Sequence, residues 1–210
     1  MNTKTQTLDA FSHALSSSAP TPGGGSAAAL TGSLAASLAC MVASLTIGKK
    51  AYQSVEADMQ TVLTEATRLR DQLLQLIDTD AEAFNHVMVA MKLPQTTENE
   101  KAERKKKLEE ALKHATEIPY QAASLCYRVL ELTEVAALEG NKNAVSDAGA
   151  GAVLGEAALQ AALLNVRINL SWIHETAFKN AYSQRRDALA GRATSKKEEI
   201  LKIMESRLKG

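Results

Sequence analysis

Three features of the sequence predict an all-α protein, a bundle of about six to eight helices around a central helix of small residues. No segment alternates apolar and polar residues as strands do, and the helix-favouring residues Ala, Leu, Glu and Lys are abundant. Apolar residues also recur at helical spacing over long segments. The 210 residues show no clear boundary or repeat, so we expect a single domain over residues 1–210.

The N-terminal part is expected to contain a short helix, a loop and the helix of small residues. The short helix covers about residues 5–15, and the Pro- and Gly-rich segment 16–26 is predicted to be a loop. The next helix reaches about Ile47, and its small residues would let another backbone approach closely, either in the core or across a dimer. The residues at helical spacing that indicate this are Gly32, Ala36, Ala39 or Cys40, and Ala43.

Two long helical segments follow. The first is expected over about residues 54–92 and to end before Pro94. The second, residues 96–117, is highly charged and is predicted to be a solvent-exposed helix. Pro119 lacks a backbone N–H, so we expect it to kink or end this helix.

Glycines and charge guide the prediction for the remainder of the chain. A further helix is expected to reach Leu138, because Gly140 is a natural helix stop. Residues 141–152 are predicted to be a polar loop that leads into an apolar helix over about residues 153–178. The charged C-terminal tail is expected to be an amphipathic helix that breaks near Gly191.

The charge balance and the cysteines restrict the class of protein. Lys+Arg and Asp+Glu number 24 each and the isoelectric point is near 6.9, so we expect no nucleic acid and no anionic membrane surface as partner. Cys40 and Cys126 lie far apart and form no disulfide framework. The N-terminus lacks the charged-then-apolar plan of a signal peptide. A cytoplasmic location is therefore expected.

Residues 26–47 are long enough to cross a bilayer, so a membrane span is one alternative for this segment. Ala, Ser, Thr and Gly dominate this segment, and these residues gain little from lipid compared with Leu, Ile or Phe. No aromatic belt flanks it. We therefore expect a buried helix in a protein without membrane spans.

Several common catalytic signatures are missing from the sequence. The four histidines are scattered without metal-ligand spacing, so no metal is expected. The glycine run 23–25 lacks the Gly-Lys-Ser/Thr ending of a phosphate-binding loop. No Gly-x-Ser-x-Gly or Cys–His signature is present.

Asp80 is the most informative polar residue because it lies on an apolar helical stripe, after Leu76 and Ile77 and before Phe84. Asp78 points about 200° away, toward the polar face, so the two acids do not form a paired site. Burial would raise the pKa of the Asp80 carboxyl toward the range useful for a general acid or base. The alternative is a structural carboxylate paired with a buried Arg or capping another helix.

Two further groups of polar residues are candidates for ligand contact. Asn165 and Asn169 lie one turn apart on an apolar stripe, where they could orient a heterocycle or merely bridge helices. Ser146 and Asp147 stand where a helix cap belongs, beside glycines that leave room for a ligand. The glycines before the small-residue helix could form an anion-binding nest. The remaining candidates are Gly24, Gly25, Ser26, Lys49, Lys50, Lys142 and Asn143.

Five ordered segments resemble one known family over about residues 5–205. They are PTPGGGSAAALTGSLAASLACMVASLTIGKKAY, LIDTDAEAF, MKLP, GNKNAVSDAG and ALLNVRINL. They are similar to the cyclodeaminase domain of formiminotransferase-cyclodeaminase and to its stand-alone bacterial members, which include methenyltetrahydrofolate cyclohydrolases. The formiminotransferase half has no counterpart in these segments, so the resemblance does not imply formimino transfer.

The resemblance implies an all-helical fold, commonly a homodimer, that binds a tetrahydrofolate derivative without a metal or redox cofactor. The family's catalytic aspartate matches the second acid of DTD, Asp80. By the same resemblance, Lys49, Lys50 or Lys142 would meet the glutamate tail of folate, with or without a polyglutamate extension. Asn165 and Asn169 would face the pterin.

The expected activity is cyclisation of 5-formiminotetrahydrofolate to 5,10-methenyltetrahydrofolate with release of ammonia. The alternative is hydrolysis of 5,10-methenyltetrahydrofolate to 10-formyltetrahydrofolate, because both reactions share an intermediate and a site. A weaker alternative is a non-catalytic folate-binding helical protein in which Asp80 is structural.

Overall fold

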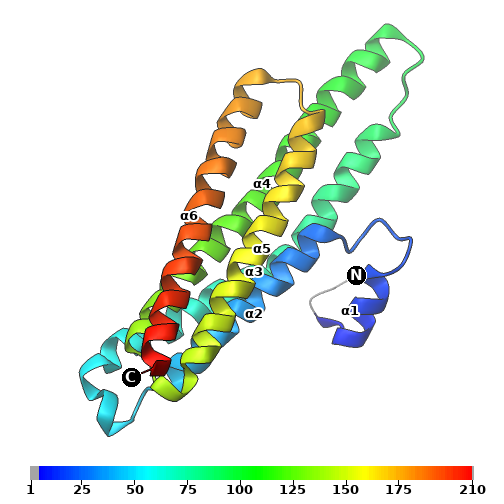
Figure 1. Cartoon of the computed structure of the whole chain (residues 1–210). Helices are drawn as coiled ribbons and strands as arrows, with labels where there is room; N and C mark the ends of the chain where they lie inside the picture. Colours follow the sequence, from blue (N-terminus) through cyan, green and yellow to red (C-terminus); the bar gives the residue numbers. More distant parts are fainter. Residues whose placement is uncertain (1–4, 210) are drawn as a thin grey trace.

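The computed structural model describes residues 5–209, which form helices and connecting turns (Figure 1). No strand occurs among these residues, so the prediction of an all-α fold is confirmed. Over the described part of the chain, the 3₁₀ segments η2 and η3 accompany helices α1 to α6. The elements are α1 (Leu8–Leu15), α2 (Gly24–Ser44), η2 (Lys50–Val55), α3 (Glu56–Met91), α4 (Glu98–Glu139), η3 (Lys142–Ala144), α5 (Val145–Trp172) and α6 (Thr176–Lys209).

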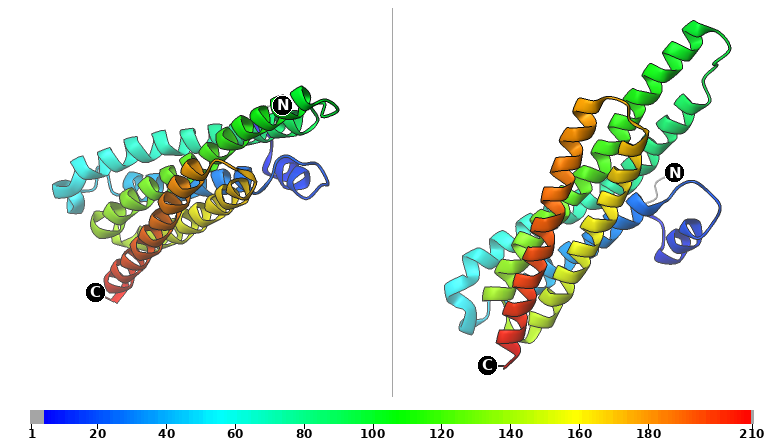
Figure 2. Two further views of the ribbon diagram at one scale, coloured as in Figure 1. Left: turned by 90° about the horizontal axis from the view of Figure 1, so that it is seen from above. Right: turned by 45° about the horizontal axis from the view of Figure 1, so that its top comes forward.

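Helices α2 to α6 lie side by side in an elongated bundle, and α4 contacts the other four (Figure 1). α2 packs against α3 and α5, whereas α6 packs against α4 and α5. Figure 2 shows that α3 and α4 extend beyond the other helices as a hairpin. α1 stands apart, beside the start of α2 (Figures 1 and 2).

The small residues of α2 make it the central helix that the sequence predicts. Its inner side is buried along its whole length, mostly through Ala, Gly and Ser. A Cβ atom added to Gly32 would lie 2.5 Å from Cys126 Sγ and 3.3 Å from Leu73 Cδ1. Glycine at this position therefore allows α3 and α4 to pack closely on α2.

Two segments, Gly24–Ser44 and Lys142–Trp172, are long and apolar enough to cross a membrane by length and composition alone. In the structure 56% and 50% of their most apolar windows is buried inside the protein. The core helix of a bundle meets the same criterion as a membrane span.

Several predicted helix ends are confirmed, whereas a helix end at Pro119 and a break near Gly191 are not found. α3 ends before Pro94, and Gly140 occupies the C-cap of α4. Pro119, however, lies inside α4, which continues unbroken through it. α6 likewise runs through Gly191, where a Cβ atom would meet nothing within 4 Å. Each helix continues through its helix-breaking residue because the helical turns before and after that residue pack against neighbouring helices.

The predicted bounds of α5 and the predicted loop before α2 also need correction. α5 begins at Val145, within the predicted loop, because its glycines serve close packing: a Cβ at Gly149 would lie 2.3 Å from Met204 Sδ. α5 ends at Trp172, before the residue 178 that the sequence predicts. The backbone N–H groups of His174 and Glu175, which follow it, donate to the carboxylate of Glu109 on α4. α2 begins at Gly24, two residues before the end of the predicted loop.

Candidate active site

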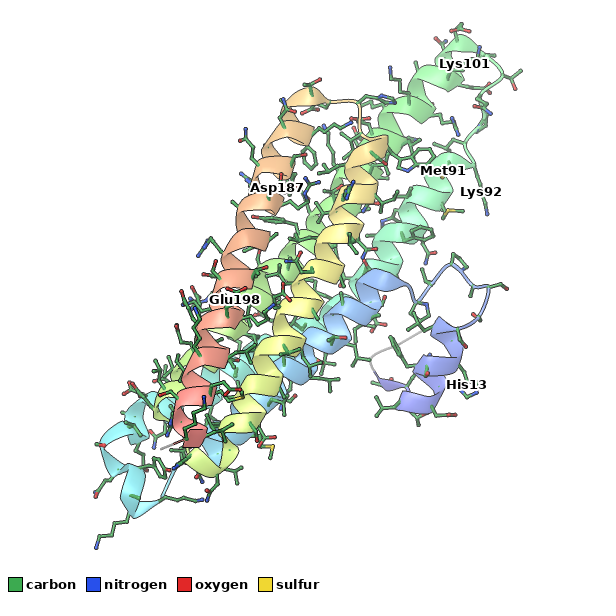
Figure 3. The ribbon with its side chains drawn as sticks, viewed as in Figure 1. His13, Met91, Lys92, Lys101, Asp187 and Glu198 are labelled. Atoms are coloured by element: carbon green, nitrogen blue, oxygen red, sulfur yellow. The ribbon has the colours of Figure 1, made fainter. Side chains whose placement is uncertain are left out.

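A cavity of about 390 Å³ lies where α2 begins. Its walls come from the loop before α2 and from α3, α4 and α5, so segments far apart in the sequence meet there. Met91, labelled in Figure 3, marks its limit at the end of α3. The lining residues are Pro20, Thr21, Gly23, Gly24, Gly25, Asp80, Phe84, Val87, Met88, Met91, Leu112, Ala115, Asn165, Ile168, Asn169 and Trp172.

Asp80 is the one ionisable residue among the described residues that line this cavity. Its side chain is half-buried on α3, and its Oδ2 lies 3.1 Å from the hydroxyl of Ser26, which donates to it. No side chain of its own segment caps α2 at Gly23. The carboxyl of Asp80 therefore approaches the positive N-terminal end of α2 from across the interface between the two helices.

Opposing effects act on the pKa of Asp80. Burial raises the pKa because it disfavours the charged form, whereas hydrogen bonds from the hydroxyl and backbone N–H of Ser26 lower it. Burial is the larger effect, so the pKa lies above its ordinary value. A carboxyl of this kind can both accept and return a proton closer to neutral pH than an exposed aspartate.

Gly25 is required for the close approach between Asp80 and α2. A Cβ atom at this position would lie 2.2 Å from Asp80 Oδ1 and 2.6 Å from its Cγ. Gly24 plays a milder part, since its Cβ would lie 3.4 Å from Asn165 Nδ2. The glycines predicted as ligand contacts therefore line the cavity, and Gly25 also leaves space for the carboxyl.

Asn169 both lines the cavity and bridges two helices. Its Nδ2 donates to the backbone carbonyl of Ala115 over 2.7 Å. In a regular helix that carbonyl would accept from the residue four positions later, which in α4 is Pro119 and has no N–H. Asn169 thus satisfies the acceptor that Pro119 leaves free.

Asn165 is held in a similar way, because its Nδ2 donates to the carbonyl of Ala161 over 2.9 Å. Within residues 5–209, neither the Oδ1 of Asn165 nor that of Asn169 accepts a hydrogen bond. Both amides line the cavity, so their oxygens are available to donors on a ligand.

The other predicted ligand contacts lie at the opposite end of α2. Within one chain, none of them reaches the cavity, because the 21-residue α2 is about 30 Å long. The prediction that Ser146 or Asp147 caps the apolar helix is wrong, since Ala144 holds the N-cap of α5. The residues at this far end are Lys49, Lys50, Lys142, Asn143 and Asp147.

Two aromatic residues at the cavity were not singled out from the sequence. Phe84 was assigned to the buried stripe of its helix, yet 38% of it is exposed. Trp172, the single tryptophan of the chain, is 55% exposed. A large exposed aromatic residue is a signal that only burial data provide, because the sequence pattern alone places it in a core.

The described residues offer neither a set of metal ligands nor a reactive thiol. Across residues 5–209, no cluster of three His, Cys, Asp or Glu side chains could hold a metal ion. Burial raises the pKa of the Cys126 thiol to about 12, so this cysteine is an inert core residue. General acid–base chemistry at one carboxyl, in a cavity lined by apolar and amide groups, is what the site can support.

The fold and cavity define a helical-bundle protein with one half-buried carboxyl at the N-terminus of its central helix. A family model described as formiminotransferase-cyclodeaminase matches residues 7–188. The chain therefore belongs to the formiminotransferase-cyclodeaminase family, as its motifs suggest, and is an enzyme of the cyclodeaminase and cyclohydrolase class.

Three similar proteins place the chain within this family. It is 42% identical to the methenyltetrahydrofolate cyclohydrolase of Methylorubrum extorquens, over 97% of this chain and 98% of that protein. It is 34% identical to the formimidoyltransferase-cyclodeaminase of Gallus gallus, over 97% of this chain but only 38% of that protein. The crystal structure of formiminotetrahydrofolate cyclodeaminase from Thermotoga maritima matches with a TM-score of 0.88 at 30% identity, covering 98% of each chain.

Proposed function

We propose that the protein cyclises 5-formiminotetrahydrofolate to 5,10-methenyltetrahydrofolate and releases ammonia. The observation that carries this proposal is the half-buried carboxyl of Asp80 in a cavity otherwise lined by apolar and amide groups. The name of the similar Thermotoga maritima structure supports it. The reaction belongs to one-carbon metabolism, and we propose that it takes place in the cytoplasm.

In the proposed mechanism, N10 of the folate attacks the formimino carbon on N5. A bond forms between N10 and this carbon while the Asp80 carboxylate takes the N10 proton. The carbon–nitrogen bond to the former imino group then breaks, and the carboxyl returns the proton to the departing nitrogen. With a second proton from solvent the nitrogen leaves as ammonia, so Asp80 ends in its starting state.

The other groups bind and orient the substrate. Phe84 and Trp172 offer aromatic surface to a flat ring system. The Oδ1 atoms of Asn165 and Asn169 accept hydrogen bonds from the amino and ring N–H donors of a pterin. This chemistry needs neither a metal nor a redox cofactor, and we propose that none takes part.

Hydrolysis of 5,10-methenyltetrahydrofolate to 10-formyltetrahydrofolate is the second candidate. The 42% identity to a protein named methenyltetrahydrofolate cyclohydrolase, over nearly the full length of both, favours it. Water would attack the bridging carbon while Asp80 accepts one of its protons. The bond from that carbon to N5 would then break as Asp80 returns this proton to N5, and the remaining hydroxyl proton would pass to solvent, which leaves the formyl group on N10. Both activities use the same bridging carbon between N5 and N10.

Absorption spectroscopy on purified protein tests both candidates. Methenyltetrahydrofolate has a near-ultraviolet band that the formyl and formimino forms lack. Growth of this band from formiminotetrahydrofolate, with matching ammonia release, supports cyclodeamination, and accelerated decay of the band supports hydrolysis. Asp80→Asn should lower the activity about 100-fold or more, whereas Asp78→Asn, a control outside the cavity, should retain it. Tight folate binding without turnover of either compound would favour a binding protein instead.

A further inference from the structure

The cavity is elongated along α3. Asp80 is the first residue of this helix that lines the cavity and Met91 is the last, so the lining extends over about 16 Å of helix. Asp80 lies at the end where α2 begins, and Met91 lies where α3 ends. The two ends of the cavity therefore differ in their distance from the carboxyl that performs the proposed chemistry.

The proposed mechanism decides which part of the folate occupies the Met91 end. This step rests on the proposed function, which places N5 and N10 of the substrate beside Asp80. The pterin contains N5, whereas the glutamate is separated from N10 by the length of the benzoyl group. The long limb of the cavity therefore suits the benzoylglutamate, and the two carboxylates of the glutamate fall near Met91.

A dicarboxylate needs cations that the cavity lining does not provide. Among the described residues that line the cavity, the one charged group is Asp80, which is an acid. Carboxylates bind best to ammonium or guanidinium partners, and a carboxylate taken out of water without one is costly. The partners must therefore come from residues just beyond the lining.

Two basic residues lie at the Met91 end. Arg104 of α4 reaches across to α3, and its Nε and Nη2 donate to the Met91 carbonyl over 3.2 Å and 3.1 Å. Lys92 follows Met91 directly as the C-cap of α3, and it is exposed (Figure 3). The last lining residue of α3 is thus in contact with one cation and is followed in the chain by another.

Both basic residues are without an acidic partner among the described residues. The described ion pairs include none with Lys92 or Arg104. The nearby acids of α4 are engaged elsewhere, since Glu100 accepts from backbone N–H groups at the start of its own helix and Glu103 pairs with Lys107. A guanidinium has five N–H groups, so Arg104 can bind a ligand without leaving the carbonyl of α3.

The other basic residues beside the lining have different surroundings. Lys113 follows Leu112 in the chain, but its ammonium group pairs with Glu175. Arg167 precedes Ile168, but it lines a separate groove with residues of α6. The lysines that the family resemblance suggests for the glutamate tail lie at the far end of α2, about 30 Å away within one chain. Among the described residues, the pair at the end of α3 remains.

We propose that Lys92 and Arg104 bind the two carboxylates of the substrate glutamate, and so select a folate over a pteroyl compound that lacks glutamate. The planar guanidinium of Arg104, oriented by its hydrogen bonds to Met91, suits bidentate contact with one carboxylate. The exposed Lys92 ammonium is a mobile point charge for the other. The MKLP segment, residues 91–94, thereby takes part in substrate recognition.

Trp172 provides a binding signal that does not depend on turnover, because it is the single tryptophan of the chain and lines the cavity. Its fluorescence is titrated with 5-formyltetrahydrofolate and with the matching pteroylamide, which keeps the pterin and benzoyl groups but lacks the glutamate. The wild-type protein should bind the folate about tenfold or more tightly than the pteroylamide.

Substitutions should remove this preference selectively. Arg104→Ala should weaken folate binding about tenfold, since Arg104 is partly buried, and Lys92→Ala about three- to fivefold, since Lys92 is exposed. Neither variant should change the Kd of the pteroylamide. Lys106→Ala, a matched control that helical spacing places on the opposite side of α4 from Arg104, should change neither Kd.

Two results would overturn the proposal. Equal weakening of both ligands by Arg104→Ala would show that this residue only holds the end of α3. An unchanged Kd for the folate in either variant would show that the replaced side chain does not meet the glutamate. Lys92→Ala keeps the test decisive where Arg104→Ala fails to fold, because it replaces an exposed side chain.

The binding result is separable from the proposed function. Turnover of a folate by a protein that shows no preference for the glutamate overturns only the role of Lys92 and Arg104. Selective binding without turnover of either folate overturns the proposed activity and leaves that role in place. Binding of neither ligand overturns both.

Discussion

Replacing Ser26 with Ala tests the role of Asp80 through its proton affinity. The Ser26 hydroxyl donates to Asp80 Oδ2 over 3.1 Å, and this hydrogen bond favours the ionised carboxylate. Without this hydrogen bond, less remains to counteract the effect of burial, which raises the pKa of Asp80, so the pKa rises further. A hydrogen bond to a charged group contributes about 1.5–3 kcal/mol, and solvent at this half-buried site reduces it toward the lower limit. The proton affinity of Asp80 should therefore increase about tenfold.

The assay is the pH dependence of kcat/KM, which reports ionisation of the free enzyme. Activity that needs ionised Asp80 falls as the pH drops through its pKa, so a raised pKa moves the acidic limb of the profile upward. Ser33→Ala is the matched control, since the Ser33 hydroxyl donates only to the Leu30 carbonyl of its own helix. An unmoved acidic limb in Ser26→Ala, or an equal movement in Ser33→Ala, would refute the reasoning.

Three further substitutions have expected outcomes. Asp80→Asn should lower turnover about 100-fold or more. It should also raise the melting temperature near pH 7 but not near pH 3, because a raised pKa in the folded state makes ionisation destabilising as the pH rises; an equal change at both values contradicts this. Gly191→Ala should stabilise by about 1 kcal/mol in urea unfolding, since its site in α6 is open; a loss of stability would show a hidden contact. Asn169→Leu should cost about 1–3 kcal/mol by leaving the Ala115 carbonyl unpaired. The cost should shrink in a Pro119→Ala background, which restores the backbone donor, and full additivity would exclude the pairing.

The helical fold and the half-buried position of Asp80 at the cavity could be predicted from the sequence because both depend on local periodicity. The stripe that contains Asp80 repeats within one helix, so its burial follows from spacing alone. An end of the helix at Pro119 and a break near Gly191 were expected because single-residue propensity does not include the neighbouring helices that pack against α4 and α6. Both errors arise because packing between helices stabilises α4 and α6, and a local sequence pattern contains no information about that packing.

The finer parts of the site were beyond the sequence for the same reason. The contact of Gly25 with Asp80 joins residues from different helices, as does the hydrogen bond from Asn169 to Ala115. The five polar residues at the far end of α2 were grouped with the cavity residues because sequence order says nothing about the distance between helix ends. Catalytic role and substrate contacts remain predictions for the experiments above.

The Ala115 carbonyl, which has no backbone donor because Pro119 lacks an N–H and which Asn169 pairs instead, has a consequence for ligand binding. Since the Asn169 amide nitrogen donates to that carbonyl, the contact between α5 and α4 fixes the orientation of the amide oxygen. A fixed acceptor needs no reorganisation on binding, and this lowers the entropic cost of recognition. The missing N–H of Pro119 thus preorganises the Asn169 amide for a ligand. With a residue that has a backbone N–H at position 119, the Ala115 carbonyl would be paired within α4 and the amide would be free to rotate.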